Sequence, residues 1–482
     1  MIPVFDPARP TVEVGRVEES SEEAVDFAVR AATAAFPGWR DRGLAARGER
    51  LLAAAEALAS RAEPIGDLLC AELGKPLADA RGEVAFSVAV LRDAVARAAG
   101  VLAPTVIDDV MGRVRTTHEP YGVCAGIVPW NAPVILAVLK LAPALIAGNA
   151  MVLKPSPLAP LALDEVVRAL APHLPDGLLG IVHGDGTTGQ ALVTHDFVRK
   201  VAFTGGEAIG VRVGELAARG IKPLVLELGG NDPAIFCADA DLERPGAIEG
   251  AVFASFLSSG QVCMAAKRLY VHESIVDRFV DSYLAAAARC LVVGDPTAPE
   301  TTIGPMISFE AVARQDALRA ESVAASGGAA RVHLLGRWDV AAQGIATGHF
   351  SRPALVTGLG DDARLVCDEQ FGPTVPLLTF RDDDDVIERA NASSLGLGAS
   401  VWSSDEDRAF ALADRLEAGM VFINCHNRAG MTMRAPFGGW KHSGHGREYG
   451  DDAILGYTQT RTTHAPASAR GVGTLEGNRY PT

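Results

Sequence analysis

A thiol and a carboxylate stand in two glycine-containing segments of this chain. Cys263 follows Gly260 in the segment Ser-Ser-Gly-Gln-Val-Cys-Met, and Glu227 precedes Gly229 in the segment Glu-Leu-Gly-Gly-Asn. A thiolate is a strong nucleophile near neutral pH, and a carboxylate can take a proton from water. Taken alone, however, any one of the seven cysteines is better explained as a buried structural residue. The residues around Cys263 must therefore indicate whether it is a catalytic nucleophile or a structural cysteine.

The two segments together resemble the paired signatures of the aldehyde dehydrogenase superfamily. The resemblance implies that Cys263 is the nucleophile and Glu227 the general base. It extends to Pro129-Trp130-Asn131, where the Asn131 amide would join the Cys263 backbone amide in an oxyanion hole. An aldehyde has no leaving group, so thiolate attack first gives a thiohemiacetal. Loss of hydride to a nicotinamide then leaves a thioester, which water hydrolyses to the acid.

The resemblance also implies a nicotinamide cofactor. Lys154, at the end of a predicted strand, would reach the adenosine ribose, and the glycines of the segment Phe203–Gly210 would let backbone amides approach the pyrophosphate. Glu369 would bind the nicotinamide ribose, and Phe371 would pack near the nicotinamide ring. The complete expected set is Ile127, Pro129, Trp130, Lys154, Ser156, Gly186, Gly205, Gly206, Ile209, Leu228, Gly229, Glu369 and Phe371.

Two departures from the family pattern bear on the choice of cofactor. Pro157 stands where many NAD-preferring relatives carry a glutamate that would repel a 2′-phosphate, and Gly206 replaces the usual serine. NAD is favoured, and NADP stays open.

Other matches concern proton transfer and the substrate. Lys140 and Glu448 match family positions proposed to relay protons from the base to solvent, although each also fits a structural ion pair. The segment 424–434 corresponds to a variable loop that shapes the aldehyde pocket. Arg428 and Arg434 could hold a substrate carboxylate or phenolate, but loop arginines are more often solvated, and His426 fits a packing or hydrogen-bonding role equally well. The aldehyde itself is not identified, and no metal site is expected.

The elements that must position these residues follow from hydrophobic patterning. The spacing of Ser20 and Glu23 predicts a first helix that begins with a capping box, and further helices are expected up to Gly100. Residues 101–120 lose this periodicity and predict a hairpin. From Gly122, short apolar runs alternate with helical patterns, which is typical of βαβ units on a parallel sheet.

The expected fold class is therefore α/β: a Rossmann-like cofactor domain, an α/β catalytic domain and a small β oligomerisation arm, as in the aldehyde dehydrogenase fold. The expected boundaries are 1–100 and 121–229 for the NAD(P)-binding domain, 230–436 for the catalytic domain, 101–120 and 455–467 for the arm, and 468–482 for a C-terminal extension.

Composition excludes several other classes. The chain has 482 residues and a formal net charge of −15, which disfavours binding to nucleic acid or anionic lipid. The cysteines form no Cys-x-x-Cys pair, and the N-terminus lacks the apolar core of a signal peptide. Prolines and Lys140 interrupt the longest apolar stretch, Val123–Gly148, so no membrane span is expected. We expect a cytoplasmic homo-dimer or homo-tetramer that binds a small aldehyde.

Two other functions are compatible with part of this sequence pattern. An enzyme that passes the acyl group to coenzyme A would keep Cys263, but such relatives commonly lack the glutamate at position 227, so hydrolysis is favoured. A non-catalytic, cofactor-binding protein could retain the fold, since fold alone does not establish function. The presence of Cys263, Asn131 and Glu227 argues against it.

Overall fold

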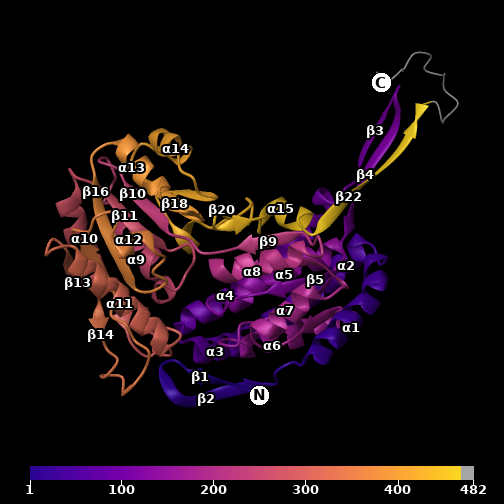
Figure 1. Cartoon of the computed structure of the whole chain (residues 1–482), viewed down its shortest axis with the longest axis horizontal. Helices are drawn as coiled ribbons and strands as arrows, with labels where there is room; N and C mark the ends of the chain where they lie inside the picture. Colours follow the sequence, from indigo (N-terminus) through magenta and orange to yellow (C-terminus); the bar gives the residue numbers. More distant parts are fainter. Residues whose placement is uncertain (468–482) are drawn as a thin grey trace.

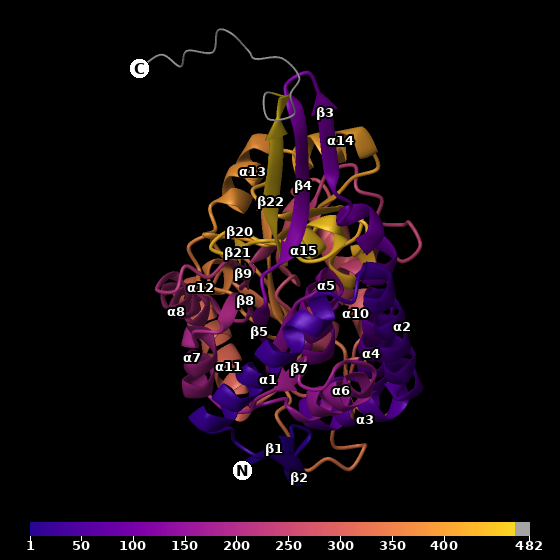
Figure 2. The same cartoon turned by 90° about the vertical axis from the view of Figure 1, so that its right-hand side faces the viewer.

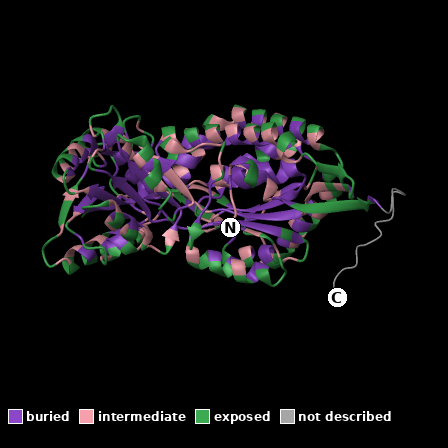
Figure 3. Ribbon diagram, turned by 90° about the horizontal axis from the view of Figure 1, so that it is seen from above, coloured by how far each residue is buried: buried purple, intermediate pink, exposed green. Residues whose placement is uncertain are grey.

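The computed structural model describes residues 1–467, which form two α/β bodies and a projecting arm (Figure 1). The predicted C-terminal extension, 468–482, lies outside the described residues. One body is built on a sheet of six strands and the other on a sheet of seven. Viewed from above, each body encloses its own buried core (Figure 3). The two bodies are called the six-stranded and the seven-stranded body below.

The six-stranded sheet carries most of the motifs expected to bind the cofactor. Its order is β21-β9-β8-β5-β6-β7, and every pair is parallel except β21 with β9. The chain order reverses between β5 and β8, which is the switch point where open parallel sheets bind ligands. The strands are β5 (Val123–Ile127), β6 (Ala150–Lys154), β7 (Leu179–Ile181), β8 (Val198–Thr204), β9 (Leu224–Glu227) and β21 (Gly444–His445).

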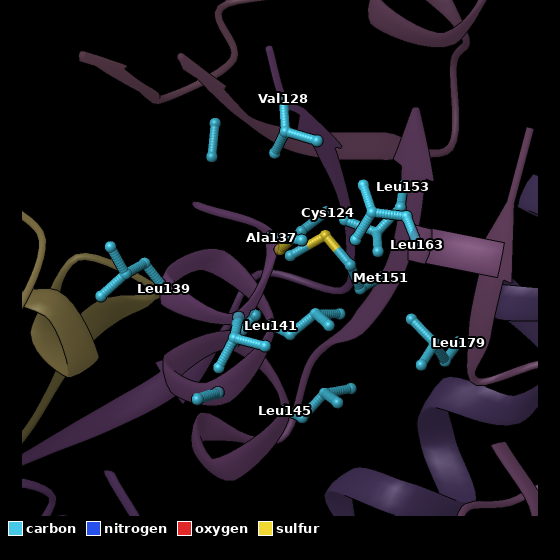
Figure 4. Close-up of a cluster of buried hydrophobic side chains, with 14 of the residues drawn as sticks. Cys124, Val128, Ala137, Leu139, Leu141, Leu145, Met151, Leu153, Leu163 and Leu179 are labelled. Carbon is cyan, nitrogen blue, oxygen red and sulfur yellow. The ribbon is translucent and has the colours of Figure 1, made fainter. Parts of the chain in front are cut away.

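Helices cover both faces of this sheet. Contacts place α1 (Glu22–Arg40), α7 (Gly186–Thr194) and α8 (Glu207–Ala218) on one face. The other face carries α5 (Pro133–Ala147) and α6 (Leu161–Leu170), packed in turn against α2 (Leu44–Ser60), α3 (Ala62–Leu73), α4 (Leu77–Val101) and α15 (Gly450–Leu455). Figure 4 shows Cys124 of β5, Met151 of β6 and Ala137 of α5 meeting in this core.

The start of the first helix differs from the prediction by one residue. Ser21, not Ser20, is the N-cap of α1, and its hydroxyl accepts a hydrogen bond from the backbone N–H of Ala24. The Ser20 hydroxyl instead accepts from the backbone N–H of His183, and the Ser20 N–H donates to the His183 carbonyl. Ser20, which the local pattern predicted as the cap, therefore forms a tertiary contact with His183 instead.

The seven-stranded sheet has the order β13-β15-β16-β11-β10-β18-β19, with only β13 antiparallel to its neighbour. Helix α9 (Ala247–Phe256) leads through a short 3-10 turn, η2 (Leu257–Gly260), to the predicted nucleophile. The strands are β10 (Asp232–Phe236), β11 (Ala266–His272), β13 (Arg331–Leu334), β15 (Ala354–Thr357), β16 (Thr374–Phe380), β18 (Gly398–Trp402) and β19 (Met420–Ile423). The other helices are α10 (Val276–Cys290), α11 (Phe309–Ala325), α12 (Arg364–Cys367), α13 (Asp383–Asn391) and α14 (Glu406–Ala413).

Shorter elements complete the two bodies. Two further strand pairs are β12 (Val292–Val293) with β14 (Arg337–Trp338), and β17 (Leu395–Gly396) with β20 (Trp440–Lys441). Two more 3-10 turns are η1 (Ala171–His173) and η3 (Asn427–Gly430).

An N-terminal hairpin, which patterning did not predict, links the two bodies. Strands β1 (Ile2–Asp6) and β2 (Arg9–Val17) pair antiparallel, and Ala8 between them is packed in the core of the seven-stranded body. Arg9 forms an ion pair with Asp295, and the His349 N–H donates to the Pro7 carbonyl at 3.0 Å. The first residues of the chain therefore contact the body that is otherwise formed from its second half.

The hairpin predicted at 101–120 is present and gains a third strand from the end of the described chain. Strands β3 (Thr105–Asp109), β4 (Gly112–Pro120) and β22 (Thr458–Pro466) form an antiparallel sheet that extends away from both bodies (Figure 2). Val106, Ile107, Val110 and Met111 are exposed on it. None of the helices in residues 1–467 is both long and apolar enough for a membrane crossing.

A buried lysine lies where this arm meets the six-stranded sheet. Lys200 on β8 is 2% exposed, and its ammonium lies over the rings of Tyr121 and Tyr457, 5.6 and 5.2 Å from their centroids. Burial lowers the pKa of Lys200 from 10.5 to about 8. Its charge is thus held by aromatic faces in place of water.

Candidate active site

The predicted nucleophile lies in a tight turn at the entry to β11. Ser258, Ser259 and Gly260 have φ values of 51°, 60° and 71°, so three successive residues adopt the left-handed conformation. A side chain at Gly260 would collide with the backbone of Gly372, so the glycine permits close approach of the 369–373 loop. Cys263 follows this bend. The local sequence Ser-Ser-Gly thus bends the chain immediately before the thiol.

The Cys263 thiol is enclosed by protein although the residue as a whole is partly exposed. Burial raises the pKa of the thiol to about 12, and the positive charge of Lys267 opposes this rise. The other charges acting on the thiol pKa are carboxylates, and each raises it: Glu369, Asp232 and Glu227. Lys267 is therefore the cation that favours the thiolate.

Asn131 lies against the same turn. It lies two residues before the start of α5, and its side-chain amide donates to the Gln261 carbonyl at 2.9 Å. The Glu83 carboxylate of α4 accepts from the N–H groups of Val134 and Ile135, at 2.9 and 3.2 Å, and also pairs with Lys75. Glu83 thus satisfies the free amides at the start of α5, as helix N-termini require.

Glu227 ends β9 and is buried. Gly444 of β21 pairs with it on one side and Thr204 of β8 on the other. Its Oε1 accepts no hydrogen bond from any residue in 1–467. Burial, together with the charge of Glu448, raises the pKa of Glu227 well above its ordinary value, and Lys140 opposes the shift. A carboxylate with a raised pKa and an unused lone pair can accept a proton.

Lys140 and Glu448 form a buried ion pair next to Glu227. Their side chains are 0% and 5% exposed, and the Lys140 ammonium donates to Glu448 Oε1 and to Thr204 Oγ1, each at 2.6 Å. Backbone hydrogen bonds in both directions between Phe437 and Glu448 hold the carboxylate in place. The geometry is that of an ion pair, and its contact with Glu227 is electrostatic.

The residues expected at the adenosine end align along one edge of the six-stranded sheet. Ile127, Lys154 and Phe203 are register partners at the carboxyl ends of β5, β6 and β8. Burial lowers the pKa of Lys154 to about 8, and its ammonium donates to the Pro155 carbonyl at 3.0 Å. The Ser156 hydroxyl accepts from the N–H of Leu158 at 3.3 Å.

Two helices begin at this edge. Gly206 is the N-cap of α8 and supplies no side-chain cap, so the first amides of the helix are free to bind an anion. A Cβ at Gly206 would meet no atom within 4 Å, which leaves room for a ligand close to the backbone. Ile209 is exposed on α8, and Gly186 begins α7 behind its N-cap Asp185. These features fit a dinucleotide.

The residues expected near the nicotinamide come from both bodies. Glu369 Oε1 accepts from the Gly230 N–H at 3.2 Å, and a Cβ at Gly229 would collide with the Glu369 carboxylate. The rings of Phe371 and Trp130 meet edge to face, with centroids 5.7 Å apart. Leu228 is buried, and Pro129 is partly buried. The loop carrying Glu369 is held in turn by the Asn231 amide, which donates to the carbonyls of Val366 and Cys367.

The loop expected to shape the aldehyde pocket places its three polar candidates differently. His426 is buried, and its Nε2 lies 3.2 Å from the Met264 carbonyl and 3.6 Å from Asp232. Arg428 pairs with Asp79 at 2.8 Å and lies over the ring of Phe253. Arg434 is exposed, and its guanidinium has no partner among residues 1–467. Arg434 alone is therefore free to meet an anionic group.

Sequence patterning missed three buried charged residues around this site: Lys267, Asp232 and Glu83. Lys267 had a local signal, because two successive cations begin the otherwise apolar strand β11. Asp232 and Glu83 had none, because Asp232 lies next to His426 and Glu83 caps a helix that begins 50 residues further along the chain, at Pro133.

Comparisons with known proteins agree with this arrangement. A model of the aldehyde dehydrogenase family matches residues 1–463. The 4-trimethylaminobutyraldehyde dehydrogenase B of Danio rerio is 37% identical over 464 residues, which cover 95% of this chain and 88% of that protein.

Two solved structures are also similar. An NAD-dependent aldehyde dehydrogenase from Sinorhizobium meliloti has a TM-score of 0.90 at 31% identity, covering 100% of this chain and 92% of that one. An NADP-dependent glyceraldehyde-3-phosphate dehydrogenase from Bacillus halodurans C-125, complexed with NADP, has a TM-score of 0.88 at 32% identity and covers 96% and 95%. The predicted α/β fold, the enzyme class and the use of NAD or NADP are confirmed. The chain belongs to the aldehyde dehydrogenase family.

Proposed function

We propose that this enzyme oxidises its aldehyde on Cys263 and releases a free carboxylic acid with Glu227 as the base. The Cys263 sulfur attacks the aldehyde carbon, and a C–S bond forms as the carbonyl oxygen becomes an oxyanion. The Asn131 side-chain amide has two hydrogens, and within residues 1–467 only one is used, on the Gln261 carbonyl. The second can donate to the oxyanion, beside the backbone amide of Cys263.

The cofactor would be held by residues at the carboxyl edge of the six-stranded sheet. The buried ammonium of Lys154 suits the adenosine ribose, and the free amides at the start of α8, next to Gly205 and Gly206, suit the pyrophosphate. Glu369 suits the nicotinamide ribose, and Phe371 the ring. When bound, NAD(P) accepts the hydride from the thiohemiacetal carbon and so leaves a thioester on Cys263. The six-stranded body is thus proposed as the cofactor domain and the seven-stranded body as the catalytic domain.

Glu227 would then activate the hydrolytic water. The observation that carries this proposal is that its buried Oε1 accepts no hydrogen bond from residues 1–467. The carboxylate takes a proton from water, the hydroxide attacks the thioester carbon, and the C–S bond breaks to return the Cys263 thiolate and release the acid. The Lys140–Glu448 pair lies next to the protonated Glu227 and provides a buried polar route for the proton to leave.

The buried Glu227, with its raised pKa, also favours hydrolysis of the thioester over transfer of the acyl group. An enzyme that passes the acyl group to coenzyme A has no need of a buried base with a raised pKa. Product analysis with and without coenzyme A decides between these reactions: free acid in both cases supports hydrolysis, and acyl-coenzyme A as the product contradicts it.

The experiment that tests the nucleophile measures nicotinamide reduction by wild type, Cys263→Ala and Cys367→Ala. Cys367 is an exposed thiol and serves as the matched control. We expect activity to be lost in Cys263→Ala and kept in Cys367→Ala. Turnover by Cys263→Ala at the wild-type rate would contradict the proposal.

The aldehyde panel should include cationic, neutral and anionic substrates, with NAD and NADP in parallel. Relatives such as the Danio rerio protein are named for 4-trimethylaminobutyraldehyde, a cationic aldehyde. The free guanidinium of Arg434 instead favours an aldehyde that carries a carboxylate or phenolate. The ratio of kcat/KM between the two charge types ranks these alternatives.

Assembly and location complete the proposal. The exposed apolar side chains of β3 and the turn after it are suited to contact a second copy, so the arm is proposed to build a homo-dimer or homo-tetramer. Free thiols fit a reducing cytoplasm. Light scattering of the full chain, compared with a Val106→Asp/Ile107→Asp variant, tests the role of the arm, and an unchanged mass would contradict it.

A further inference from the structure

Lys267 lies under the turn that carries Cys263. It is the second residue of β11 and is 3% exposed. Its ammonium donates to the carbonyls of Val262, at 2.8 Å, and of Cys263, and it forms an ion pair with Glu369 at 3.3 Å. One buried cation therefore bonds both to the backbone of the nucleophile and to a proposed cofactor ligand.

These bonds belong to a longer pattern. Asn131 donates to the carbonyl of residue 261, Lys267 to those of residues 262 and 263, and the His426 imidazole lies within hydrogen-bond distance of that of residue 264. Four successive carbonyls are thus held by buried side chains. Because each peptide unit is planar, fixing a carbonyl also fixes the direction of the N–H that follows it. The Cys263 amide, expected to bind the oxyanion, belongs to the peptide unit whose carbonyl Lys267 holds.

The charge of Lys267 matters as much as its hydrogen bonds. The charges that act most strongly on the Cys263 thiol are those of Lys267, Glu369, Asp232 and Glu227, and the thiol also interacts with the Tyr449 hydroxyl. Only Lys267 in this set is cationic and favours the thiolate. A neutral residue at position 267 would leave no cation in this set.

We propose that Lys267 is a positioning residue for the nucleophile, which orients the Cys263 peptide and places a positive charge beside the sulfur before the aldehyde arrives. This inference rests on the proposed role of Cys263. Lys267 would thus have two effects: its hydrogen bonds orient the Cys263 peptide, and its charge stabilises the thiolate. Different substitutions at position 267 separate these effects.

The test measures alkylation of Cys263 by iodoacetamide as a function of pH, with the modified peptide identified by mass spectrometry. Lys267→Met removes the hydrogen bonds and the charge, Lys267→Gln keeps a donor without the charge, and Lys267→Arg keeps both. Lys222→Met is the matched control. Lys222 also donates to two backbone carbonyls, but these belong to Val193 and His195, outside the turn that carries Cys263.

We expect Lys267→Met and Lys267→Gln to raise the pKa of the Cys263 thiol by about one unit, which slows its alkylation about tenfold at every pH below that pKa. Lys267→Arg should restore most of the rate, and Lys222→Met should match wild type. In turnover, Lys267→Met should lower kcat with little change in the KM of the aldehyde.

Two results would overturn the inference. A Lys267→Gln profile that coincides with wild type would remove the role of the charge, and a Lys267→Met profile that coincides would remove both roles. Neither result depends on turnover. The proposed role of Cys263 is tested separately. If Cys263→Ala still oxidised aldehydes, Cys263 would not be the nucleophile, whatever the rate of Cys263 alkylation in the Lys267 variants.

Discussion

Replacing Lys200 by methionine should stabilise the enzyme. The lysine is 2% exposed, and burial lowers its pKa from 10.5 to about 8. That difference corresponds to about 3 kcal/mol of unfavourable free energy for keeping the ammonium inside the fold. Two cation–π contacts, with Tyr121 and Tyr457, return about 0.5–1 kcal/mol each. The balance predicts that Lys200→Met raises the free energy of unfolding by about 1–2 kcal/mol at neutral pH.

The stability gained by Lys200→Met should also depend on pH. The folded-state pKa is depressed, so the cost of Lys200 is complete below pH 8 and disappears as the pH rises through about 8 toward 10.5. The advantage of Lys200→Met should shrink over the same interval. Thermal unfolding followed by circular dichroism measures it, with a shift of about 1 °C for each kcal/mol when all 482 residues unfold together.

The control is Arg199→Met, because Arg199 is the exposed neighbour on the same strand. Its removal should leave the unfolding midpoint within about 0.5 °C of wild type. A lower midpoint for Lys200→Met at neutral pH would refute the reasoning, since it would mean that the two tyrosine rings compensate the ammonium fully for its lost hydration.

Three further variants test the site. Glu227→Gln should give one rapid burst of reduced cofactor per subunit and then a steady rate about 10²–10⁴-fold lower, because the thioester waits for an unassisted water; a proportional loss of the burst would be inconsistent with a base for hydrolysis. Glu83→Ala should lower the free energy of unfolding by about 3–5 kcal/mol, since Lys75 loses its partner and α5 its cap; a thermal midpoint equal to wild type would contradict this. Arg434→Ala should raise the KM of a carboxylate-bearing aldehyde about tenfold and leave that of an uncharged one unchanged, and equal effects on both would rule out charge recognition.

The sequence predicts the parallel sheet well because buried strands have a local signature. The run Cys124–Val128 and the run Lys200–Phe203 fall on β5 and β8, and Gly74 ends α3 in the left-handed conformation expected of a cap. The motif pair Glu227 and Cys263 likewise stands close enough to characteristic glycines to be recognised from its neighbours alone.

What the sequence does not reveal is set by contacts between distant residues. The N-terminal hairpin consists of two short strands, in which only Val4 and Val17 are buried. No long apolar run therefore marks it, and its attachment through Arg9 to Asp295 is tertiary. The assignment of Arg428 to an ion pair, and of Arg434 to solvent, likewise depends on where Asp79 of α4 lies. Local patterns carry no information about such partners.

The pairing of β21 with β9 has a consequence for biosynthesis. Strand β9 ends at Glu227, and its outer neighbour in the sheet begins only at Gly444. Because a ribosome adds about 5–20 residues each second, the edge of β9 stays unpaired for roughly 10–40 s of translation. During that interval the edge is open to pairing with another nascent chain, and the ammonium of Lys140 has no Glu448 to meet. Glu227 acquires its final surroundings only after nearly the whole chain has been synthesised.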